Sequence, residues 1–465
     1  MSWSLEALIE ATEGVLAGEL LGNEPVVFDS ISTDTRTLKS GALYIAIKGE
    51  HFNGHDFIAE AVKQGAVAVL ISEPVDTIVP AVLVEDTRLA LGMFAAWHRQ
   101  KMPLKKLIAV TGSNGKTTCK NMIRHLLSKE ARVLATEGNL NNDFGVPRTL
   151  LEITEEDEYA VIEMGANHSG EIDYLSRLAQ PDVAVITLAA GAHLEGFGSL
   201  EGVIRTKGEI LVGLTPNEGV MVLNTGSPGY DYWLEQCQKR ALRLITFGVN
   251  QAAQLSYHHF RQQQDGIVFE VHYRESTSDP VKTATATLPV LGEHNALNAL
   301  AAMAAVMAAG IEFEALPPRL ADFSGVTGRL QQVSLPNGLL IDDSYNANPD
   351  SMKAALRTLT SLAGESLACL GAMAELGETA EQAHEDVAHY ARQQGVRYLL
   401  VYGEAAKPMI SAFGEGAYWF DNHQALAERA VALIQEQGIN HCLVKGSRSS
   451  KMETVANLIQ QQLLS

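Results

Sequence analysis

The feature that most constrains the fold is a short segment in which an apolar strand runs through a glycine-bearing turn into a helix. Residues 107–110 are apolar and predict a buried strand, and residues 119–127 carry apolar side chains at helical spacing. The turn between them ends in Lys116-Thr117. This order gathers backbone N–H groups and the positive end of a helix dipole around one point. The segment therefore predicts an anion-binding loop at the edge of a parallel α/β sheet.

The loop predicts a nucleoside triphosphate and Mg2+ as ligands. Lys116 would reach the outer phosphates, and the Thr117 hydroxyl would bind the metal ion. The turn is shorter than the standard pattern, because Val110 stands where that pattern has its first glycine. The alternative is a surface turn with a solvated lysine, which the combination of strand, Lys-Thr and helix disfavours. The loop residues predicted to contact ATP are Gly112, Ser113, Asn114, Gly115, Lys116, Thr117 and Thr118.

Chain length and the alternation of strand and helix signals predict three α/β domains. A chain of 465 residues is too long for one core. Residues 1–103 predict a small α/β domain, residues 104–326 a central parallel-sheet ATPase domain, and residues 327–465 a Rossmann-like α/β domain. Within the central part, residues 254–291 are polar and β-rich, which predicts an exposed antiparallel flap.

Charge and cysteine usage exclude several classes of protein. A net charge of −20 argues against a general nucleic-acid or acidic-membrane binder. The four cysteines form no CxxC pair, which predicts reduced thiols rather than a disulfide framework or zinc site. The N-terminus lacks the pattern of a signal peptide, and the most apolar run, residues 299–309, is too short to span a bilayer. We expect a cytoplasmic monomer that neither binds nucleic acid nor inserts into membranes.

Candidate catalytic side chains follow predicted strands near the loop. Glu163 ends an apolar strand, where a carboxylate could hold Mg2+; a helix-capping or solvated acid is the alternative. His193 follows the next strand, residues 183–188, and gains weight only from its neighbours. Lys207, considered alone, predicts a surface lysine paired with Glu209.

Further candidates lie toward the C-terminus. Asn295 begins a predicted helix, and Arg329 follows a glycine-containing loop. Residues 342–349 close a strand with small polar side chains, for which a ligand loop and a plain turn are equally good interpretations. Residues 445–448 follow another apolar strand and suit an anionic group such as a carboxylate, with a basic surface turn as the alternative.

Together and in this order, the motifs resemble those of the Mur ligases along essentially the whole chain. Each motif is modest alone, and the complete series is specific. The Asn-rich loop at 139–142 and Tyr-Asn-Ala-Asn at 345–348 are typical of the branch that adds D-alanyl-D-alanine. The resemblance rests on residues 32–36, 48–57, 112–117, 138–147, 163–168, 193–199, 207–209, 328–330, 343–348 and 445–448.

The resemblance implies an ATP-dependent amide ligase. The first domain would hold UDP-MurNAc-tripeptide, the second ATP and Mg2+, and the third the incoming D-alanyl-D-alanine. The tripeptide carboxylate would attack the γ-phosphate to give an acyl phosphate, and the amine would displace phosphate. The products would be UDP-MurNAc-pentapeptide, ADP and phosphate. A free carboxylate needs such a leaving group, and catalysis then consists mostly of positioning and charge neutralisation.

The same resemblance implies roles for individual residues. The implied catalytic residues are Lys116, Glu163, His193 and Lys207, with Thr117 and Glu163 on one Mg2+, His193 on a second, and Lys207 a metal ligand if carbamylated. Further ATP contacts would be Asn295, Arg329 and Asp343. The UDP-sugar and its peptide would meet Ser32, Thr33, Asp34, Arg36, Lys48, Gly49, His55, Asn139, Asn141 and Asn142. The D-alanyl-D-alanine region would comprise Tyr345, Asn346, Asn348, Lys445, Ser447 and Arg448.

Two departures and several alternatives remain. Leu188 stands where the family often has Asn, and Ala372 replaces the Asp of a Gly-Asp-Met-x-Glu-Leu-Gly pattern. A sibling ligase adding diaminopimelate or lysine is one alternative, although its Asp-Asn-Pro-Arg motif is matched only by Asp-Asn-His-Gln at 421–424. Folylpolyglutamate synthase fits the Asn-rich loops poorly. A phosphate-loop switch is the alternative from another class, and no guanine motif supports it.

Overall fold

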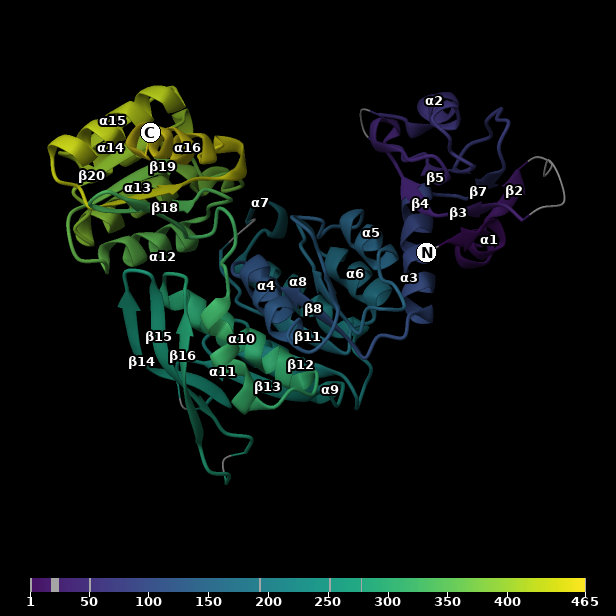
Figure 1. The fold of residues 1–465 in the computed structure, drawn as a ribbon, viewed down its shortest axis with the longest axis horizontal. Coiled ribbons are helices and arrows are strands. Elements are labelled where there is room, and N and C mark those ends of the chain that lie inside the picture. The colour runs from purple at the N-terminus through teal and green to yellow at the C-terminus, as the bar shows by residue number, and fades with distance from the viewer. Residues whose placement is uncertain are drawn as a thin grey trace.

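A computed structural model describes residues 2–17, 25–49, 52–191, 194–250, 252–276 and 278–464 of the chain. These residues form three α/β domains in succession, each built on its own main sheet (Figure 1). The N-terminal and C-terminal domains lie on opposite sides of the central domain. The mainly parallel α/β architecture confirms the predicted fold class. The domain limits at 103/104 and 326/327 stay predictions.

The N-terminal domain has a five-stranded sheet in the order β2-β7-β6-β5-β4, parallel except for β2 at one edge. Strands β5 and β6 are apolar and buried throughout, as expected for parallel strands that are covered on both faces. The elements are β1 (Trp3–Ser4), α1 (Leu5–Thr12), β2 (Val15–Ala17), β3 (Val27–Phe28), β4 (Ser30–Ser32), β5 (Ala42–Ile45), α2 (Ile58–Lys63), β6 (Ala68–Ile71) and β7 (Ala81–Leu83).

The central domain has a nine-stranded sheet in the order β16-β15-β14-β13-β12-β11-β8-β10-β9. The loop-bearing strand β8 lies between β10 and β11 and is parallel to both, so their carboxyl ends share one edge. The elements are β8 (Lys106–Thr111), α4 (Lys116–Leu127), β9 (Val133–Ala135), α5 (Gly145–Leu151), β10 (Tyr159–Glu163), α6 (Glu171–Ala179), β11 (Val183–Ile186), α7 (Leu194–Phe197), α8 (Leu200–Gly208), β12 (Val220–Asn224), α9 (Tyr230–Lys239) and β13 (Arg243–Gly248).

The predicted antiparallel segment extends this sheet rather than standing apart as a flap. Its three strands pair antiparallel with one another, and β14 joins β13. Phe269 and Leu288 are buried in the same core as α10, so only part of the segment is exposed. Within the described ranges no helix combines the length and apolarity needed to cross a bilayer. The elements are β14 (Leu255–Gln263), β15 (Gly266–Tyr273), β16 (Lys282–Leu288), α10 (Glu293–Ala308) and α11 (Leu316–Arg319).

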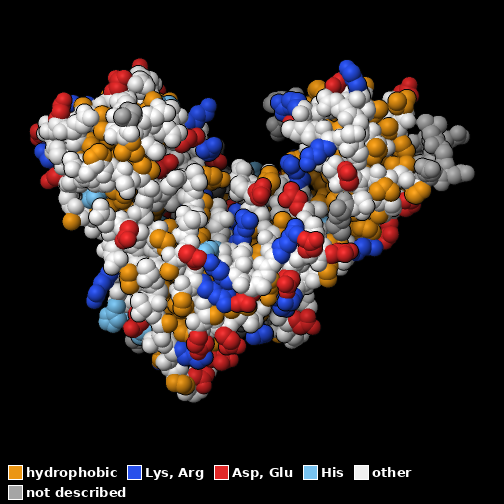
Figure 2. All heavy atoms as spheres, in the orientation of Figure 1, with side chains coloured by type: hydrophobic (Ala, Val, Ile, Leu, Met, Phe, Trp, Pro, Cys, Tyr) orange, Lys and Arg blue, Asp and Glu red, His pale blue; other side chains and the backbone are white. Residues whose placement is uncertain are grey.

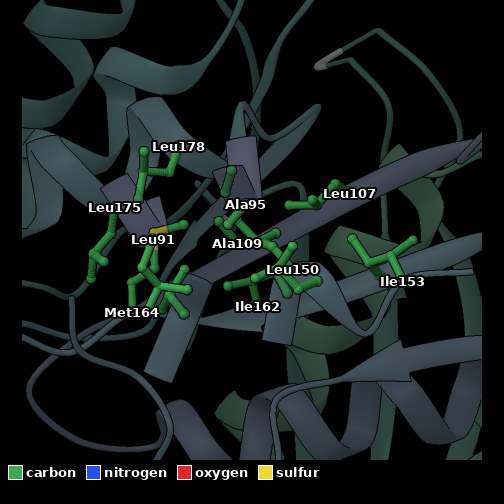
Figure 3. Packing of buried hydrophobic residues seen from close by; sticks show 14 of the residues in the cluster. Leu91, Ala95, Leu107, Ala109, Leu150, Ile153, Ile162, Met164, Leu175 and Leu178 are labelled. Carbon is green, nitrogen blue, oxygen red and sulfur yellow. The ribbon is translucent and has the colours of Figure 1, made fainter. Parts of the chain in front are cut away.

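Helix α3 (Thr87–Lys101) joins the first two domains through packing as well as sequence. Leu91 and Ala95 lie in one apolar cluster with Leu150 of α5 and Leu175 of α6 (Figure 3). At the end of α3, His98 accepts a hydrogen bond from Trp3 Nε1 at 3.1 Å and donates from Nε2 to a central-domain carbonyl. The helix is therefore anchored in the core of the central domain.

The C-terminal domain has a six-stranded sheet in the order β17-β18-β22-β19-β20-β21, with β17 antiparallel at the edge. β18 and β22 are parallel neighbours, and their register sets Asp343 beside Lys445. The elements are β17 (Gln331–Leu335), β18 (Gly338–Asp343), α12 (Pro349–Thr360), β19 (Ser366–Gly371), α13 (Ala380–Gln393), β20 (Tyr398–Tyr402), α14 (Pro408–Phe413), β21 (Ala417–Phe420), α15 (His423–Glu436), β22 (His441–Lys445) and α16 (Glu453–Leu464).

Candidate active site

The phosphate loop links β8 to α4 at the carboxyl edge of the central sheet. Gly112 and Gly115 have φ of 146° and 82°, which glycine adopts without steric cost. A Cβ at Gly112 would lie 2.0 Å from Thr187 Oγ1, and one at Gly115 would lie 2.3 Å from Asn298 Oδ1. Since α4 begins at Lys116, the first N–H groups of this helix face the loop. The geometry is that of an anion cradle, as the sequence predicts.

Lys116 closes the loop on itself. Its Nζ donates to the carbonyl oxygens of Gly112 at 2.7 Å and Ser113 at 3.4 Å. Burial lowers the pKa of this ammonium, and the Glu163 carboxylate opposes the shift. Phosphate oxygens would compete with these two carbonyls for the same cation.

Glu163 ends β10 and is 2% exposed. Its Oε1 accepts a hydrogen bond from Asn141 Nδ2 at 2.8 Å, whereas its Oε2 has no hydrogen-bond partner. The Lys120 ammonium lies 3.9 Å from Oε2 and donates to the Thr136 carbonyl at 2.5 Å. A buried carboxylate oxygen without a donor is costly, so this oxygen suits a cation. Lys120, one helical turn after Lys116, was not among the sequence candidates.

Lys207 lies in α8 and is 2% exposed, so the surface ion pair considered from sequence is wrong. Burial, followed by the Lys116 charge, lowers its pKa to about 7. The ammonium lies 5.2 Å from the centre of the Phe197 ring. His193 lies outside the described residues. Among the described side chains, no group of three or more His, Cys, Asp or Glu is arranged to hold a metal ion.

A cavity of about 390 Å³ lies between α10 and α12 and brings together three predicted ATP contacts, Asn295, Arg329 and Asp343. Asp343 accepts from Lys445 Nζ at 2.7 Å, and this pair is buried. Lys445 therefore lines this α10–α12 cavity, although the sequence grouped it with the dipeptide region. Leu188, at the position where the family often has Asn, lines the same cavity.

A second cavity, of about 310 Å³, lies between the phosphate loop and loops of the C-terminal domain; we call it the loop cavity. It brings four residues of the predicted dipeptide region into reach of Lys116 and Thr117. These four residues are Asn346, Asn348, Ser447 and Arg448. Glu375 and Leu376, which belong to the Gly-Asp-Met-x-Glu-Leu-Gly pattern but were given no role from sequence, also line it.

Direct contacts join the two domains around this cavity. Asn348 Nδ2 donates to Asn114 Oδ1 at 2.8 Å. Arg329 Nη2 lies 3.5 Å from Thr117 Oγ1, and its guanidinium stacks 4.2 Å from the centre of the Tyr345 ring. The C-terminal loops are thus seated on the phosphate loop in this conformation.

The N-terminal candidates form two polar clusters on their own domain. Arg36 binds both carboxylate oxygens of Asp34, and this hydrogen bonding lowers the pKa of Asp34 to about 2. His55 Nε2 accepts from the Ser72 N–H at 2.9 Å, which leaves Nδ1–H to bond the Asn53 side chain. Burial lowers the pKa of His55.

Two candidates of the Asn-rich loop make hydrogen bonds within the central domain. Asn141 contacts Glu163, and Asn142 Oδ1 accepts from the Gly145 N–H at 2.8 Å at the start of α5. Ala372 lacks a polar side chain, and its backbone carbonyl accepts from Ser447 N at 3.1 Å and Ser450 Oγ at 2.9 Å.

Comparison with known families matches all three parts of the chain to Mur ligase models. Residues 27–99 match "Mur ligase family, catalytic domain", residues 110–306 match "Mur ligase middle domain", and residues 328–448 match "Mur ligase, glutamate ligase domain".

Curated relatives align over nearly the full length. The UDP-N-acetylmuramoyl-tripeptide–D-alanyl-D-alanine ligase of Escherichia coli K12 is 41% identical over 453 residues, which cover 96% of this chain and 97% of that one. The Haemophilus influenzae ligase of the same name is 40% identical and covers 97% of each chain.

Solved structures give the same family. A crystal structure of MurF from Acinetobacter baumannii superimposes with a TM-score of 0.92 at 33% identity and covers 99% of both chains. MurF from Thermotoga maritima in complex with ADP gives a TM-score of 0.82 at 25% identity and covers 94% of this chain and 98% of that one.

Proposed function

This chain belongs to the Mur ligase family, and we propose that it joins D-alanyl-D-alanine to UDP-N-acetylmuramoyl-tripeptide at the expense of ATP. The observation that carries the proposal is a full-length likeness to ligases of that activity, together with a phosphate loop that opens onto a cavity of the C-terminal domain. The products are UDP-MurNAc-pentapeptide, ADP and phosphate, so the reaction is a step of peptidoglycan precursor synthesis. We place it in the cytoplasm.

We assign ATP to the phosphate loop and the α10–α12 cavity. The N–H groups at the start of α4 and the Lys116 ammonium would hold the outer phosphates. Asn295, Arg329 and Asp343 line the cavity in which the nucleoside would lie. Arg329 stands at both cavities, so it would neutralise phosphate charge between them.

Mg2+ fits the donors beside the loop. The Thr117 hydroxyl and Glu163 Oε2, which has no hydrogen-bond partner, are oxygen ligands of the kind this ion prefers. Bound there, the ion would offset the repulsion between the tripeptide carboxylate and the triphosphate. A carbamate on Lys207 would add a further oxygen donor. The pKa of the Lys207 amine is about 7, which leaves a substantial fraction of uncharged amine available to CO2 at neutral pH.

We assign each substrate to the residues of one domain or loop. The N-terminal clusters around Asp34 and His55 would bind the UDP-sugar, and the loop at Asn139–Asn142 the muramoyl-peptide. The tripeptide carboxylate then meets the γ-phosphate at the cradle, and the resulting acyl phosphate faces the loop cavity. There the amine of the dipeptide displaces phosphate and forms the amide.

One incubation tests the function. UDP-MurNAc-tripeptide, ATP and Mg2+ are mixed with the protein and a panel of amino acids and dipeptides, and products are read by mass. We expect UDP-MurNAc-pentapeptide with D-alanyl-D-alanine and little product with diaminopimelate or lysine. The K116A variant should lose amide synthesis, because the cradle loses its cation. Phosphate release that ignores the dipeptide and the muramoyl substrate would instead indicate a switch-type ATPase.

A further inference from the structure

Lys120 is a buried lysine to which the proposed function gives no role. It is 2% exposed, and it follows Lys116 by one turn of α4, so the two side chains lie on the same face of the helix. A lysine is almost never buried to this degree unless it is paired. The partners of Lys120 therefore indicate what its burial serves.

Lys120 has two partners beside the phosphate loop. Its Nζ donates to the Thr136 carbonyl at 2.5 Å and lies 3.9 Å from Glu163 Oε2. The first contact is a hydrogen bond, whereas the second is too long for one. Lys120 thus balances the charge of Glu163 at a distance, and its directional bond goes to the backbone at Thr136.

Thr136 is the point at which the chain leaves the central sheet for the Asn-rich loop, residues 139–142. β9 ends at the preceding residue, and the Thr136 N–H donates to the Val161 carbonyl at 3.0 Å. The Thr136 hydroxyl accepts from the Glu163 N–H at 2.9 Å. Together with the bond from Lys120, these contacts fix the start of the loop against both β10 and α4.

The other end of the Asn-rich loop is tied to the same strand end. Asn141 Nδ2 donates to Glu163 Oε1 at 2.8 Å, and the Gly165 N–H donates to the Asn141 carbonyl at 2.8 Å. Residues 137–139, between the two anchors, are exposed. The position of the loop relative to α4 therefore depends on the anchors at Thr136 and Asn141, and Lys120 is the side chain of α4 that holds the first of them.

We infer that Lys120 is a positioning residue, which holds the Asn-rich loop at a fixed distance from the phosphate loop so that the muramoyl-peptide carboxylate meets the γ-phosphate. The inference rests on the proposed function, which assigns the peptide to the Asn-rich loop and the phosphates to the cradle at Lys116. One helix carries both lysines, and four helical residues advance about 6 Å along its axis. α4 therefore acts as a rigid spacer between two substrates, and an error of about 1 Å in such a spacing costs a reaction about 100-fold.

Hydrogen exchange followed by mass spectrometry tests the positioning in the free protein. K120M keeps the length of the side chain and removes its charge and its donor. We expect peptides that span residues 137–142 to exchange faster in K120M than in the parent protein, while peptides of α10 exchange equally. K129M is the matched control, because Lys129 is exposed just beyond the end of α4 and pairs with Asp322. It should exchange like the parent protein. Equal exchange of residues 137–142 in K120M and the parent protein overturns the inference.

A second comparison separates positioning from charge balance. K120M leaves the buried Glu163 carboxylate without its cation, which destabilises the fold by itself. The double variant K120M/E163Q removes both charges and is compared with E163Q, so that the two proteins differ only at Lys120. Calorimetry without ATP measures the Kd for UDP-MurNAc-tripeptide. We expect the double variant to bind about 10- to 100-fold more weakly than E163Q, the usual loss when the support of a binding group is removed. Equal Kd values would reduce Lys120 to a counter-charge and refute the positioning role.

Steady-state rates place the effect on the reaction. We expect K120M to lower kcat for pentapeptide formation about 10- to 100-fold with KM for ATP unchanged, because the cradle itself is intact. A loss that falls on KM for ATP and spares kcat would place Lys120 at the nucleotide and contradict the inference. A parent protein that forms no pentapeptide overturns the proposed function instead, and the exchange experiment still decides whether Lys120 fixes the loop.

Discussion

At the scale of single residues, the buried His384 positions a loop that lines the loop cavity, through a hydrogen bond to the backbone of that loop. Its Nδ1–H donates to the Ala380 carbonyl at 2.6 Å, and its Nε2 accepts the Met373 N–H. Both bonds require the neutral ring in one tautomer. Burial lowers the pKa of His384 below its usual 6.5, which agrees with that requirement.

We expect H384A to destabilise the C-terminal domain by about 2–4 kcal/mol, since the change leaves a cavity and a buried N–H without an acceptor. H384Q keeps an acceptor and a donor and should lose less. Thermal unfolding followed by circular dichroism measures both. A rise in KM for the dipeptide in H384Q, with KM for ATP unchanged, would show that His384 also positions the loop at Met373. Equal stability of H384A and the parent protein would contradict the expected loss of stability.

The same histidine predicts a pH dependence. The unfolded chain binds a proton near pH 6.5, whereas the folded His384 resists protonation. Its contribution is therefore complete above about pH 6.5 and is lost as the pH falls below that value. The stability advantage of the parent protein over H384Q should shrink between about pH 7 and pH 5. An advantage that stays constant over this range would contradict the neutral tautomer.

Lys207 predicts a covalent modification. A buried amine with a pKa of about 7 is partly uncharged at neutral pH and can add CO2. Protein prepared with 13C-bicarbonate at about pH 8 should show a carbamate carbon by NMR, and K207A should not. A spectrum without that signal in the parent protein would leave Lys207 as a buried free amine.

The positions of site residues at strand ends could be predicted from the sequence, but the side chains that pair with them could not. Glu163 could be placed beside the phosphate loop, because parallel strands end at one edge. Its neighbour Lys120 lies on the buried side of α4, and no sequence pattern indicates that a lysine at this position is buried beside Glu163. Lys445 meets Asp343 across 102 positions of sequence, a pairing that depends on the order of strands in the sheet.

At the scale of elements, α12 couples a helix start to the phosphate loop. Asn348 caps the helix through its Oδ1, which accepts the Ser351 N–H at 2.9 Å, and its Nδ2 contacts Asn114. N348A should lower stability by about 1 kcal/mol, the usual cost of losing a cap. N348D keeps the cap and adds a negative charge beside the loop to which we assign the phosphates.

These two variants should therefore separate the two roles. We expect N348D to unfold near the parent temperature but to raise KM for ATP, because the new charge repels the triphosphate. Melting curves and initial rates at varied ATP measure the difference. A normal KM for ATP in N348D would show that Asn348 serves only the helix.

The packing of α3 depends on one small residue. A Cβ at Gly92 would lie 2.0 Å from the Tyr174 hydroxyl oxygen, where α3 crosses α6. G92A should destabilise by about 1–3 kcal/mol despite the better helix propensity of alanine. Y174F removes the clashing oxygen and should recover part of the loss in the double variant. Additive effects of the two changes, measured by thermal unfolding, would contradict the contact.

Sequence periodicity predicted strands such as β8 and β10 but not this attachment of α3. Apolar runs such as those of β8 and β10 are sufficient to predict buried parallel strands. Which domain a linking helix packs against is decided by surfaces far apart in sequence. The same limit made residues 254–291 look like an exposed flap: their antiparallel pairing is confirmed, but polar outward positions conceal that β14 continues the central sheet.

At the scale of the whole molecule, the two outer domains are attached differently. The C-terminal loops already touch the phosphate loop through Asn348 and Arg329. The N-terminal domain reaches the central one through α3 and the bond from Trp3 to His98. A hollow separates the two outer domains above the central domain (Figure 2). On the proposed function, the substrates assigned to the two outer domains must meet at the phosphate loop, so we expect that hollow to narrow when they bind.

Small-angle X-ray scattering should therefore show a smaller radius of gyration when UDP-MurNAc-tripeptide and a non-hydrolysable ATP analogue are both present. The analogue alone should change the radius less, because the cavities to which we assign ATP are already formed between the central and C-terminal domains. The H98A variant removes the acceptor for Trp3 and the donor to Ile153, so it should loosen the N-terminal domain and enlarge the radius of the free protein. A radius that ignores the muramoyl substrate would mean that its peptide reaches the phosphate loop across the hollow without domain movement.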